Sequence, residues 1–311
     1  MELLIGAGVI AATLRLATPI AFAALGGVIT ERSGVTNIAL EGCMLFGAFF
    51  GILAADKTGS APLAVLIGLL AGTVLAAVHA VASVTWRADQ IVTGMALNIL
   101  ALGVTSYLNY EIYGSGVPSG VPLLPALNLD FLAGVPFVGG VIGHQNVLVW
   151  LALVLVIVLQ LYMFRTVAGL RLRAVGEHPR AADTVGIDVR RTRYWAVLAS
   201  GGLAALGGVY LTVADTGSFT DGLTNGRGFI GLAAMIFGRW TPVGALVASL
   251  IFGYGDALSV SLQGVSIGDL RIPVQLLSTI PYLLTILAVA GFVGRSRPPA
   301  ADGVPYESEG H

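Results

Sequence analysis

Polar side chains that could do chemistry are few in this chain, and three of them interrupt otherwise apolar stretches. Asn37 and Glu41 lie four residues apart in "GVTNIALEGCMLFG", and Asn98 lies inside "VTGMALNIL". Such groups either line a polar passage or join helices through hydrogen bonds, because a polar or ionisable group surrounded by lipid needs a partner. Both interpretations remain open for Asn37, Glu41 and Asn98.

No catalytic motif accompanies these residues. The chain lacks the His-Glu-x-x-His zinc motif, the Gly-x-Ser-x-Gly nucleophile motif and the Gly-x-x-x-x-Gly-Lys-[Ser/Thr] phosphate loop. A single cysteine, Cys43, excludes an internal disulfide and a cysteine-based metal site. The net charge of −1 gives no indication of nucleic-acid binding. We therefore predict a protein that is not an enzyme, holds no cofactor of its own and binds no nucleic acid.

The highest density of charge lies elsewhere, in "RLRAVGEHPRAADTVGIDVRRTR" at residues 171–193. Within this stretch His178 can serve as a helix N-cap, and Pro179 suits the first helical position, where its missing N–H is not needed. Gly186 supplies a left-handed residue of the kind that ends helices. The pattern predicts a helix of about two turns over residues 179–185.

The faces of this short helix indicate how it would be used. Ala182 and Val185 are three residues apart and Ala181 and Val185 are four apart, so the pattern predicts a shared apolar face. Glu177 and Arg180 are expected at the rim of that face. A helix this short is unstable alone, so we expect support from its own protein and from a docking partner.

Long apolar stretches must position these residues. The chain is 56% hydrophobic and 11% charged, whereas soluble domains carry about 25% charged residues. A bilayer is crossed by about 20 apolar residues in a helix, because lipid cannot hydrogen-bond to the backbone. We predict an all-α, polytopic membrane protein with about eight or nine transmembrane helices. The expected spans lie near 10–29, 40–55, 62–85, 91–112, 147–164, 194–214, 228–240, 242–262 and 274–293.

The distribution of basic residues predicts orientation. Seven of the sixteen Lys and Arg residues fall between positions 165 and 193, and short basic loops remain in the cytoplasm. The N-terminus is then outside and the C-terminus cytoplasmic. We predict one transmembrane domain over 1–296, with a cytoplasmic loop at 166–193 and an external loop at 114–146. The polar segment 297–311 is expected to be a disordered cytoplasmic tail.

A weak internal repeat adds to this organisation. The string "AALGGV" occurs at 23–28 and again at 204–209, each time at the end of an expected span. A polar segment and then a short, glycine-containing apolar stretch follow each copy. The two copies would cross the membrane in opposite directions. This pattern predicts two inverted pseudo-repeats with short or broken helices, as in many transporters.

Three segments resemble one known family. They are "LGGVITERSGVTNIALEGCMLFGAF" (25–49), "RAVGEHPRAADTVGIDVRRTR" (173–193) and "GRGFIGLAAMIFGRWTPVGALVASLIFG" (226–253). Together they resemble the inner-membrane permease subunits of ABC importers in the ribose and branched-chain amino-acid permease superfamily. The resemblance covers nearly the whole chain, and its Glu-Arg-Ser-Gly…Leu-Glu-Gly form is most similar to the branch that handles nucleosides and simple sugars.

The resemblance implies a function and a set of partners. The chain is expected to lie in the lipid of the bacterial inner membrane. Its expected function is to form the translocation pathway for a nucleoside or simple sugar across that membrane. The expected partners are a cytoplasmic ATP-binding cassette subunit that binds the ATP, a second permease subunit (a paralogue or another copy) and an extracytoplasmic substrate-binding lipoprotein.

The resemblance also assigns roles to residues. Loop 166–193 corresponds to the coupling loop of the family, and the polar residues of the spans would lie on the pathway wall or directly behind it. The residues expected to contact the ATPase are Glu177, His178, Pro179, Arg180, Ala181, Ala182, Val185 and Gly186.

An ion-coupled secondary transporter of a small polar solute remains the alternative. Such transporters also use inverted repeats and polar residues at membrane depth. Glu41 alone is a plausible ligand for a coupling ion. That class leaves the short helix at 179–185 unexplained.

Overall fold

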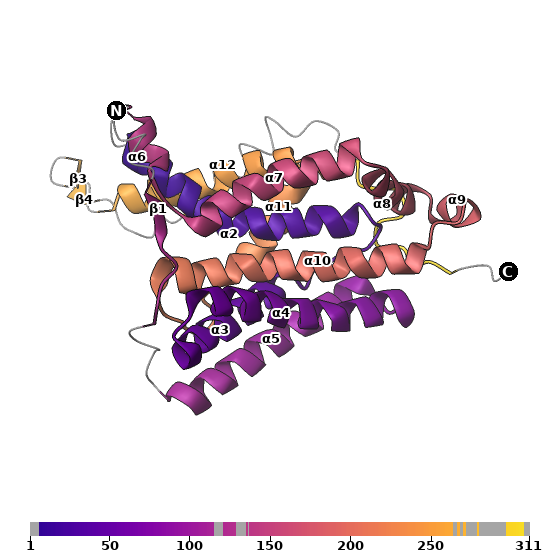
Figure 1. Ribbon diagram of the computed structural model, residues 1–311, viewed down its shortest axis with the longest axis horizontal. Helices are drawn as coiled ribbons and strands as arrows, with labels where there is room; N and C mark the ends of the chain where they lie inside the picture. Colours follow the sequence, from indigo (N-terminus) through magenta and orange to yellow (C-terminus); the bar gives the residue numbers. More distant parts are fainter. Residues whose placement is uncertain are drawn as a thin grey trace.

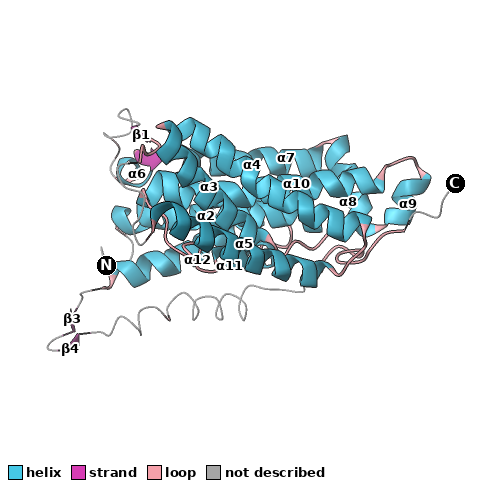
Figure 2. Ribbon diagram, turned by 90° about the horizontal axis from the view of Figure 1, so that it is seen from below, coloured by secondary structure: helices cyan, strands magenta, loops and turns pink. Residues whose placement is uncertain are grey.

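The computed structural model describes residues 6–114, 121–128, 135, 137–263, 266–267, 270–271, 279 and 297–307. Within them the chain is mostly helical. The long helices lie lengthwise beside one another in an elongated bundle (Figures 1 and 2). The expected span at 274–293 lies outside the described residues, apart from residue 279.

Six helices of the described part are long and apolar enough to cross a membrane. The predicted spans at 40–55 and 228–240 correspond to helices that do not meet this description. These are α3 (Leu40–Thr58), which carries charges at both ends, and α11 (Arg227–Phe237), which has 11 residues. The six are α2 (Ala7–Glu31), α4 (Ala61–Ala80) with its π-helical end Val81–Thr85, α5 (Gln90–Tyr113), α7 (Val147–Arg165), α10 (Val189–Val209) with its π-helical end Tyr210–Thr216, and α12 (Pro242–Ser261).

Helices α2 and α10 lie antiparallel at the centre of the bundle. Gly26 of α2 faces Ser200 of α10, and Gly207 of α10 faces Pro19 of α2. Helix α2 also packs against α11 and α12, whereas α10 also packs against α3 and α4. Helix α5 packs mainly on α3. The α2–α10 pair therefore joins an early group of helices to a late group.

Small residues allow these close approaches. The glycine pairs at 47–51 and 68–72, which the sequence suggests are packing positions, lie against α10. A Cβ added to Gly47 would lie 2.6 Å from the Cα of Ala205, and one added to Gly72 would lie 2.4 Å from the Ala205 Cβ. Real side chains do not pack so closely, so glycine at these positions is what lets the helices approach each other.

The two ends of the bundle differ. At one end lie α8 (Val167–Glu177), α9 (Pro179–Thr184) and the described part of the C-terminal tail (Figure 1). The basic α2–α3, α4–α5 and α11–α12 connections also contact this end, as the charge distribution predicts: Arg32 pairs with Glu177, Arg190 donates to Thr85, and Arg32 donates to the Trp240 carbonyl.

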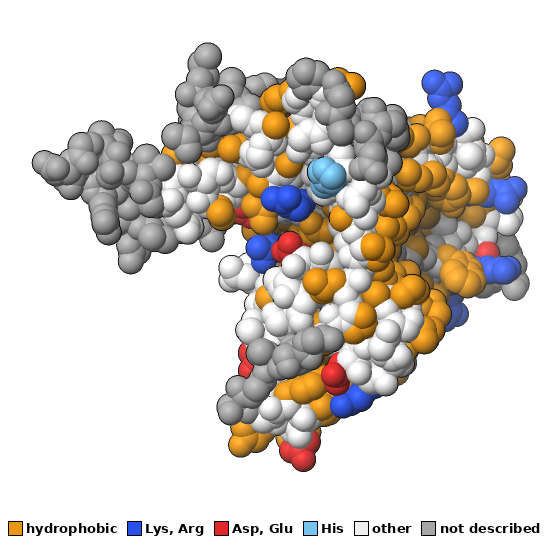
Figure 3. Space-filling view, turned by 60° about the vertical axis from the view of Figure 1, so that its left-hand side comes forward, with side chains coloured by type: hydrophobic (Ala, Val, Ile, Leu, Met, Phe, Trp, Pro, Cys, Tyr) orange, Lys and Arg blue, Asp and Glu red, His pale blue; other side chains and the backbone are white. Residues whose placement is uncertain are grey.

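The opposite end, where α2 begins, contains short elements of the predicted external loop. Strand β1 (Ala126–Asn128) pairs antiparallel with β2 (His144–Asn146), and α6 (Val138–Ile142) precedes β2. The two-residue strands β3 (Ser266–Ile267) and β4 (Leu270–Arg271) form a second pair. With this end turned forward, Figure 3 shows a broad hydrophobic band along the flank and charged side chains singly or in small groups.

The tail differs from the sequence-based expectation of disorder. In the described part, 297–307, the backbone N–H of Ala301 donates to the Gly176 carbonyl at 2.9 Å, and Ala301 is 8% exposed. The carbonyl of Val304 accepts from Arg193 at 2.9 Å. Composition alone suggests disorder because the segment has few apolar residues, but its polar groups are satisfied by hydrogen bonds to the bundle.

Candidate functional site

The short helix predicted at 179–185 is present as α9, Pro179–Thr184. Pro179 occupies its first turn, as predicted. His178 stands at the N-cap position, but its side chain makes no capping hydrogen bond. The sequence therefore locates the helix correctly, although the expected side-chain cap at its start is absent.

The end of α9 follows the predicted glycine signal. Gly186 has φ +81°, and its N–H donates to the Asp183 carbonyl at 2.9 Å. The N–H of Ile187 donates to the Ala182 carbonyl at 3.1 Å. These two bonds form a Schellman motif, which fixes the direction in which the chain leaves the helix. The turn after α9 is thus well defined despite the short length of the helix.

The predicted shared face of Ala182 and Val185 is wrong. Ala182 is 3% exposed and packs in a cluster with Val175 and Val189, whereas Val185 is 75% exposed. Val185 is the C-cap residue and has left the helical conformation (φ −96°, ψ 14°), so helical spacing no longer relates the two side chains. Ala181 is exposed. Ala182 therefore anchors α9 to the protein, while Ala181 and Val185 face outward.

The two predicted rim residues also differ. Arg180 is exposed at the start of α9. Glu177 is turned toward its own protein: its carboxylate accepts from the backbone N–H of Ala300 at 3.2 Å and pairs with Arg32 at 3.9 Å. Both side chains lie at the surface, and Glu177 also helps to hold the end of α8 in place.

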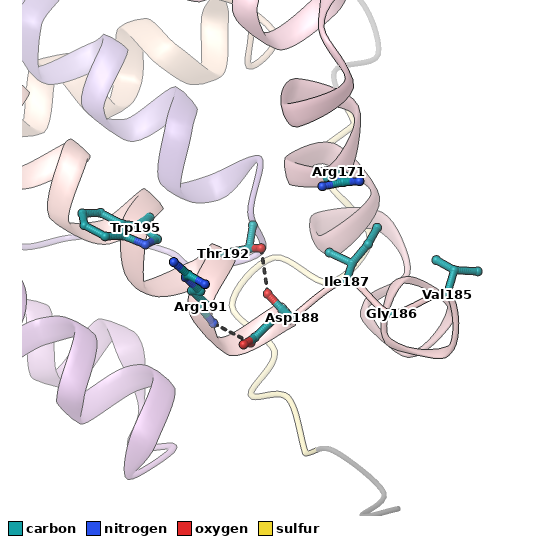
Figure 4. Close-up of a pocket in the computed structure, with 8 residues that line it drawn as sticks. All are labelled: Arg171, Val185, Gly186, Ile187, Asp188, Arg191, Thr192 and Trp195. Carbon is teal, nitrogen blue, oxygen red and sulfur yellow. Dashed lines mark hydrogen bonds between the residues drawn. The ribbon is translucent and has the colours of Figure 1, made fainter.

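A groove of about 580 Å³ lies beside α9. Figure 4 shows Arg171 of α8, the turn 185–188 after α9, and Arg191 and Trp195 of α10 around it. The Asp188 carboxylate caps α10 by accepting from the Arg191 N–H at 2.9 Å. Trp195 is 63% exposed. The groove therefore combines basic and apolar side chains on a rigid support, which suits a protein surface of complementary charge.

Asn37 lies at the other candidate site, in the connection that leads into α3. It is 0% exposed. Its Nδ2 donates to the Ser200 hydroxyl at 3.1 Å, and its Oδ1 accepts from the backbone N–H of Ala39 at 3.0 Å. Asn37 thus connects the start of α3 to α10.

Asn98, on α5, binds the same connection from the opposite side. Its Oδ1 accepts from the N–H of Gly42 at 2.8 Å, and its Nδ2 donates to the Ile38 carbonyl at 2.9 Å. A mid-span amide satisfies two backbone groups that would otherwise lack partners where the helix begins. Asn98 therefore fixes α5 to the first turn of α3.

Glu41 joins α3 to α11. Its Oε1 accepts from the Thr224 hydroxyl at 2.6 Å and from the N–H of Gly226 at 2.9 Å, and its Oε2 accepts from the N–H of Gly228 at 2.6 Å. A carboxylate at a helix N-terminus satisfies free N–H groups and interacts favourably with the helix dipole. Glu41 thus caps α11 from another helix.

The structure therefore brings Asn37, Glu41 and Asn98 around the single segment 37–42. Their hydrogen bonds join this segment to α10, α5 and the start of α11. The segment just before it is held in the same way, because the His79 ring lies 3.1 Å from the Thr36 carbonyl through Nε2.

Several partners of these residues were not recognised in the sequence. Ser200 and Thr224 are separated from Asn37 and Glu41 by more than 160 residues, so no local pattern reveals the pairing. The Trp240 indole donates to the Glu31 carboxylate across a similar separation. The only hint of this pairing in the sequence is that Glu31 and Trp240 lie in the motifs "ERSG" and "GRWTPVG", which belong to two of the segments that resemble the family.

Comparison with known proteins agrees with this architecture. The family model described as "Branched-chain amino acid transport system / permease component" matches residues 9–289. The chain is 40% identical over 314 residues to the guanosine ABC transporter permease protein NupQ of Bacillus subtilis, with 96% of each chain covered. It is also 40% identical over 305 residues to the nucleoside ABC transporter permease protein NupC of Lactococcus lactis, again with 96% of each covered.

One solved structure shows a similar fold. It is described as an inward-facing conformation of a metal-chelate type ABC transporter, and the TM-score is 0.50 at 18% sequence identity. The match covers 92% of this chain and 86% of that one. At this identity the similarity concerns the fold.

Proposed function

We propose that this chain, which belongs to the permease family of branched-chain amino acid transport systems, is the transmembrane permease subunit of an ABC importer for a nucleoside or a simple sugar. The observation that carries the proposal is 40% identity, over 96% of both chains, to permeases named for guanosine and nucleoside transport. A nucleoside is the first choice of solute. In this role the chain has no catalytic activity, and ATP is hydrolysed by a partner subunit.

The pathway is proposed to be built from two inverted halves. Reciprocal packing supports this: Gly26 of α2 contacts α10 while Gly207 of α10 contacts α2. In the same way, Gly27 contacts Met235 of α11, and Gly208 contacts Met44 of α3. These glycines belong to the two copies of "AALGGV". Helices α3 and α11 would then be the matching short helices, which together with the run at 274–293 bring the count of spans toward eight or nine.

The end of the bundle that contains α9 is proposed to face the cytoplasm and an ATP-binding cassette subunit. The support is the concentration of arginines in α8, α9 and the start of α10, together with the outward-facing Val185. The N-terminus then lies outside and the C-terminus in the cytoplasm of a bacterial cell. A second permease subunit would complete the pathway, and an extracytoplasmic binding lipoprotein would deliver the solute.

Asn37, Glu41 and Asn98 are proposed to act from behind the pathway wall. Their hydrogen bonds set the position of segment 37–42 relative to α5, α10 and α11. Because these helices come from both halves of the chain, a change in their arrangement would move segment 37–42 as well. The residues thus shape the pathway without being required to touch the solute.

Transport assays test this function directly. The transporter, assembled with its partner subunits in proteoliposomes, should accumulate radiolabelled guanosine only when ATP is enclosed on the α9 side, and vanadate should abolish uptake. Labelled glucose in parallel vesicles tests the sugar alternative. Uptake that resists vanadate but collapses with ionophores would reject the proposal and favour an ion-coupled secondary transporter.

A further inference from the structure

The described tail, residues 297–307, lies at the α9 end of the bundle, between α9 and the segment that leads into α3. Figure 4 shows it as a pale yellow ribbon that passes α8, α9 and the start of α10. It contacts the connection into α3, Arg87, and the stretch from the end of α8 through α9 to α10. The contacts are hydrogen bonds with defined partners, and they continue along the tail from Ala300 to Glu307.

The first set of contacts is with the end of α8. The N–H of Ala301 donates to the Gly176 carbonyl at 2.9 Å, and the N–H of Ala300 donates to the Glu177 carboxylate at 3.2 Å. Gly176 is itself in close contact with the α2–α3 connection, because an added Cβ would lie 2.3 Å from the Arg32 carbonyl oxygen. Tail, α8 and connection therefore meet at one point without room for side chains between them.

The second set is with the connection into α3. The Asp302 carboxylate accepts from the Thr36 hydroxyl at 3.1 Å. Thr36 immediately precedes Asn37, and its N–H donates to the Gln90 side chain at 2.7 Å. Burial raises the pKa of the Asp302 carboxyl above its ordinary value, while the hydrogen bond from Thr36 opposes this. Asp302 thus connects the tail to the residue next to the segment held by Asn37, Glu41 and Asn98.

The third set is with α9 itself. The Tyr306 hydroxyl donates to the Asp183 carboxylate at 2.6 Å. The Tyr306 ring packs against the cluster that contains Ala182, Val175 and Val189. The same side chain therefore contacts α9 through both a hydrogen bond and apolar surface.

The Val304 carbonyl, between these two attachment points, is held by Arg193 at 2.9 Å. Arg193 lies on α10 and is 2% exposed. The tail is thus fixed to α10 midway between Asp302 and Tyr306. By contrast, the outer ion pair of Glu307 with Arg87 is exposed and contributes little.

We propose that tail residues 297–307 form a strap that positions α9 relative to segment 36–42, with Tyr306 and Asp302 as its two positioning residues. When a docked ATPase displaces α9, the strap carries part of that displacement to the start of α3. This rests on the proposed function, in which α9 receives the ATPase. The strap adds a second link between α9 and the start of α3, because the tail contacts both directly. The first link is the chain itself, which continues from α9 into α10.

The geometry of the strap can be tested without any transport assay. In the assembled transporter, Arg87→Cys combined with Glu307→Cys should be joined by a short bifunctional thiol crosslinker, and each single variant should not, because these two exposed side chains are paired while the contacts of Tyr306 and Asp302 stay in place. The native Cys43 is 0% exposed and should remain unreactive. Absence of the crosslink would overturn the strap whatever the protein transports.

The positioning role needs a different measurement. Tyr306→Phe keeps the packed ring and removes the hydrogen bond to Asp183. We expect guanosine uptake per ATP hydrolysed to fall about threefold to tenfold, the factor for loss of one hydrogen bond. ATPase association and thermal stability should stay close to those of the unmodified protein. The matched control is Tyr107→Phe, at a 65% exposed position on α5, which should leave the ratio unchanged.

The outcomes separate the two hypotheses. An unchanged uptake-to-ATP ratio in Tyr306→Phe, with the crosslink present, would overturn the positioning role of the tail. A fall in ATPase association in this variant would also overturn it, because Tyr306 would then act through docking. If the unmodified complex imports no nucleoside or sugar, the proposed function is wrong, while the crosslink still reports whether the strap exists.

Discussion

Val185→Asp tests directly whether the surface at α9 receives a partner subunit. Val185 is 75% exposed in the isolated chain, so the change should alter the stability of the permease by no more than about 0.5 kcal/mol. A docked ATPase would cover this side chain. The substitution then removes the burial of a valine and places a carboxylate in the interface.

The expected loss of affinity follows from these two effects. Full burial of a valine side chain stabilises a complex by about 1.5–3 kcal/mol. An unpaired carboxylate taken out of water adds a further penalty of several kcal/mol unless the interface rearranges. Since about 1.4 kcal/mol corresponds to a factor of ten, the loss of the valine alone should weaken ATPase binding at least about tenfold.

Co-purification and uptake assays measure this effect. Val185→Asp should insert normally, lose most of its ATPase and lose uptake. Val135→Asp, at an exposed position (44%) at the opposite end of the bundle, is the matched control. It should insert normally and keep both its ATPase and its uptake. Ala182→Asp is a different test, because Ala182 is 3% exposed and a buried charge should impair the permease itself. ATPase binding by Val185→Asp within twofold of normal would refute the docking surface.

Four further outcomes are expected. Glu41→Gln should lower the free energy of unfolding by about 1–3 kcal/mol, because the amide nitrogen cannot accept a hydrogen bond from a backbone N–H as the second carboxylate oxygen does. Chemical denaturation in detergent measures this. Asn98→Leu should lower uptake and also stability by about 2 kcal/mol, because two backbone groups lose their partners; failure of assembly would show that it acts only in packing. The tail should be held more firmly as the pH falls, because burial raises the pKa of Asp302, which lies beside Arg193 and Glu31, and the docked tail therefore binds a proton more tightly; the mobility of a spin label attached beforehand at Glu307→Cys measures this, and mobility that stays constant or rises as the pH falls would contradict it. Gly208→Ala should prevent folding, measured as loss of monodisperse protein, because its Cβ would lie 1.8 Å from the Met44 carbonyl oxygen.

Local signals in the sequence predicted local structure well. Pro179 and Gly186 locate a helix of less than two turns because each acts through its own backbone geometry, which needs no distant partner. The apolar runs predict the long helices for a similar reason. Helix α2 continues through Pro19, a residue that often interrupts helices.

The side-chain assignments were less accurate where burial depends on distant segments. Ala182 and Val185 look equivalent by spacing, but Ala182 is covered by residues of α8, α10 and the tail. The composition of the tail predicts disorder because it contains little apolar surface. Its order arises from acceptors and donors on α8, α9 and α10, which composition cannot show. Long-range hydrogen bonds therefore account for most of what the sequence did not reveal.

The start of α3 is the part of the molecule in which these long-range bonds meet. Segment 36–42 is held by α10 through Asn37, by α5 through Asn98, by α11 through Glu41 and by the tail through Thr36. A segment bonded on four sides cannot move alone without leaving several buried polar groups unpaired, and each of these costs about 1–3 kcal/mol. It should therefore move together with at least some of its neighbours. Alternating exposure of a pathway beside it would then require rigid movement of helices rather than local unfolding of this connection.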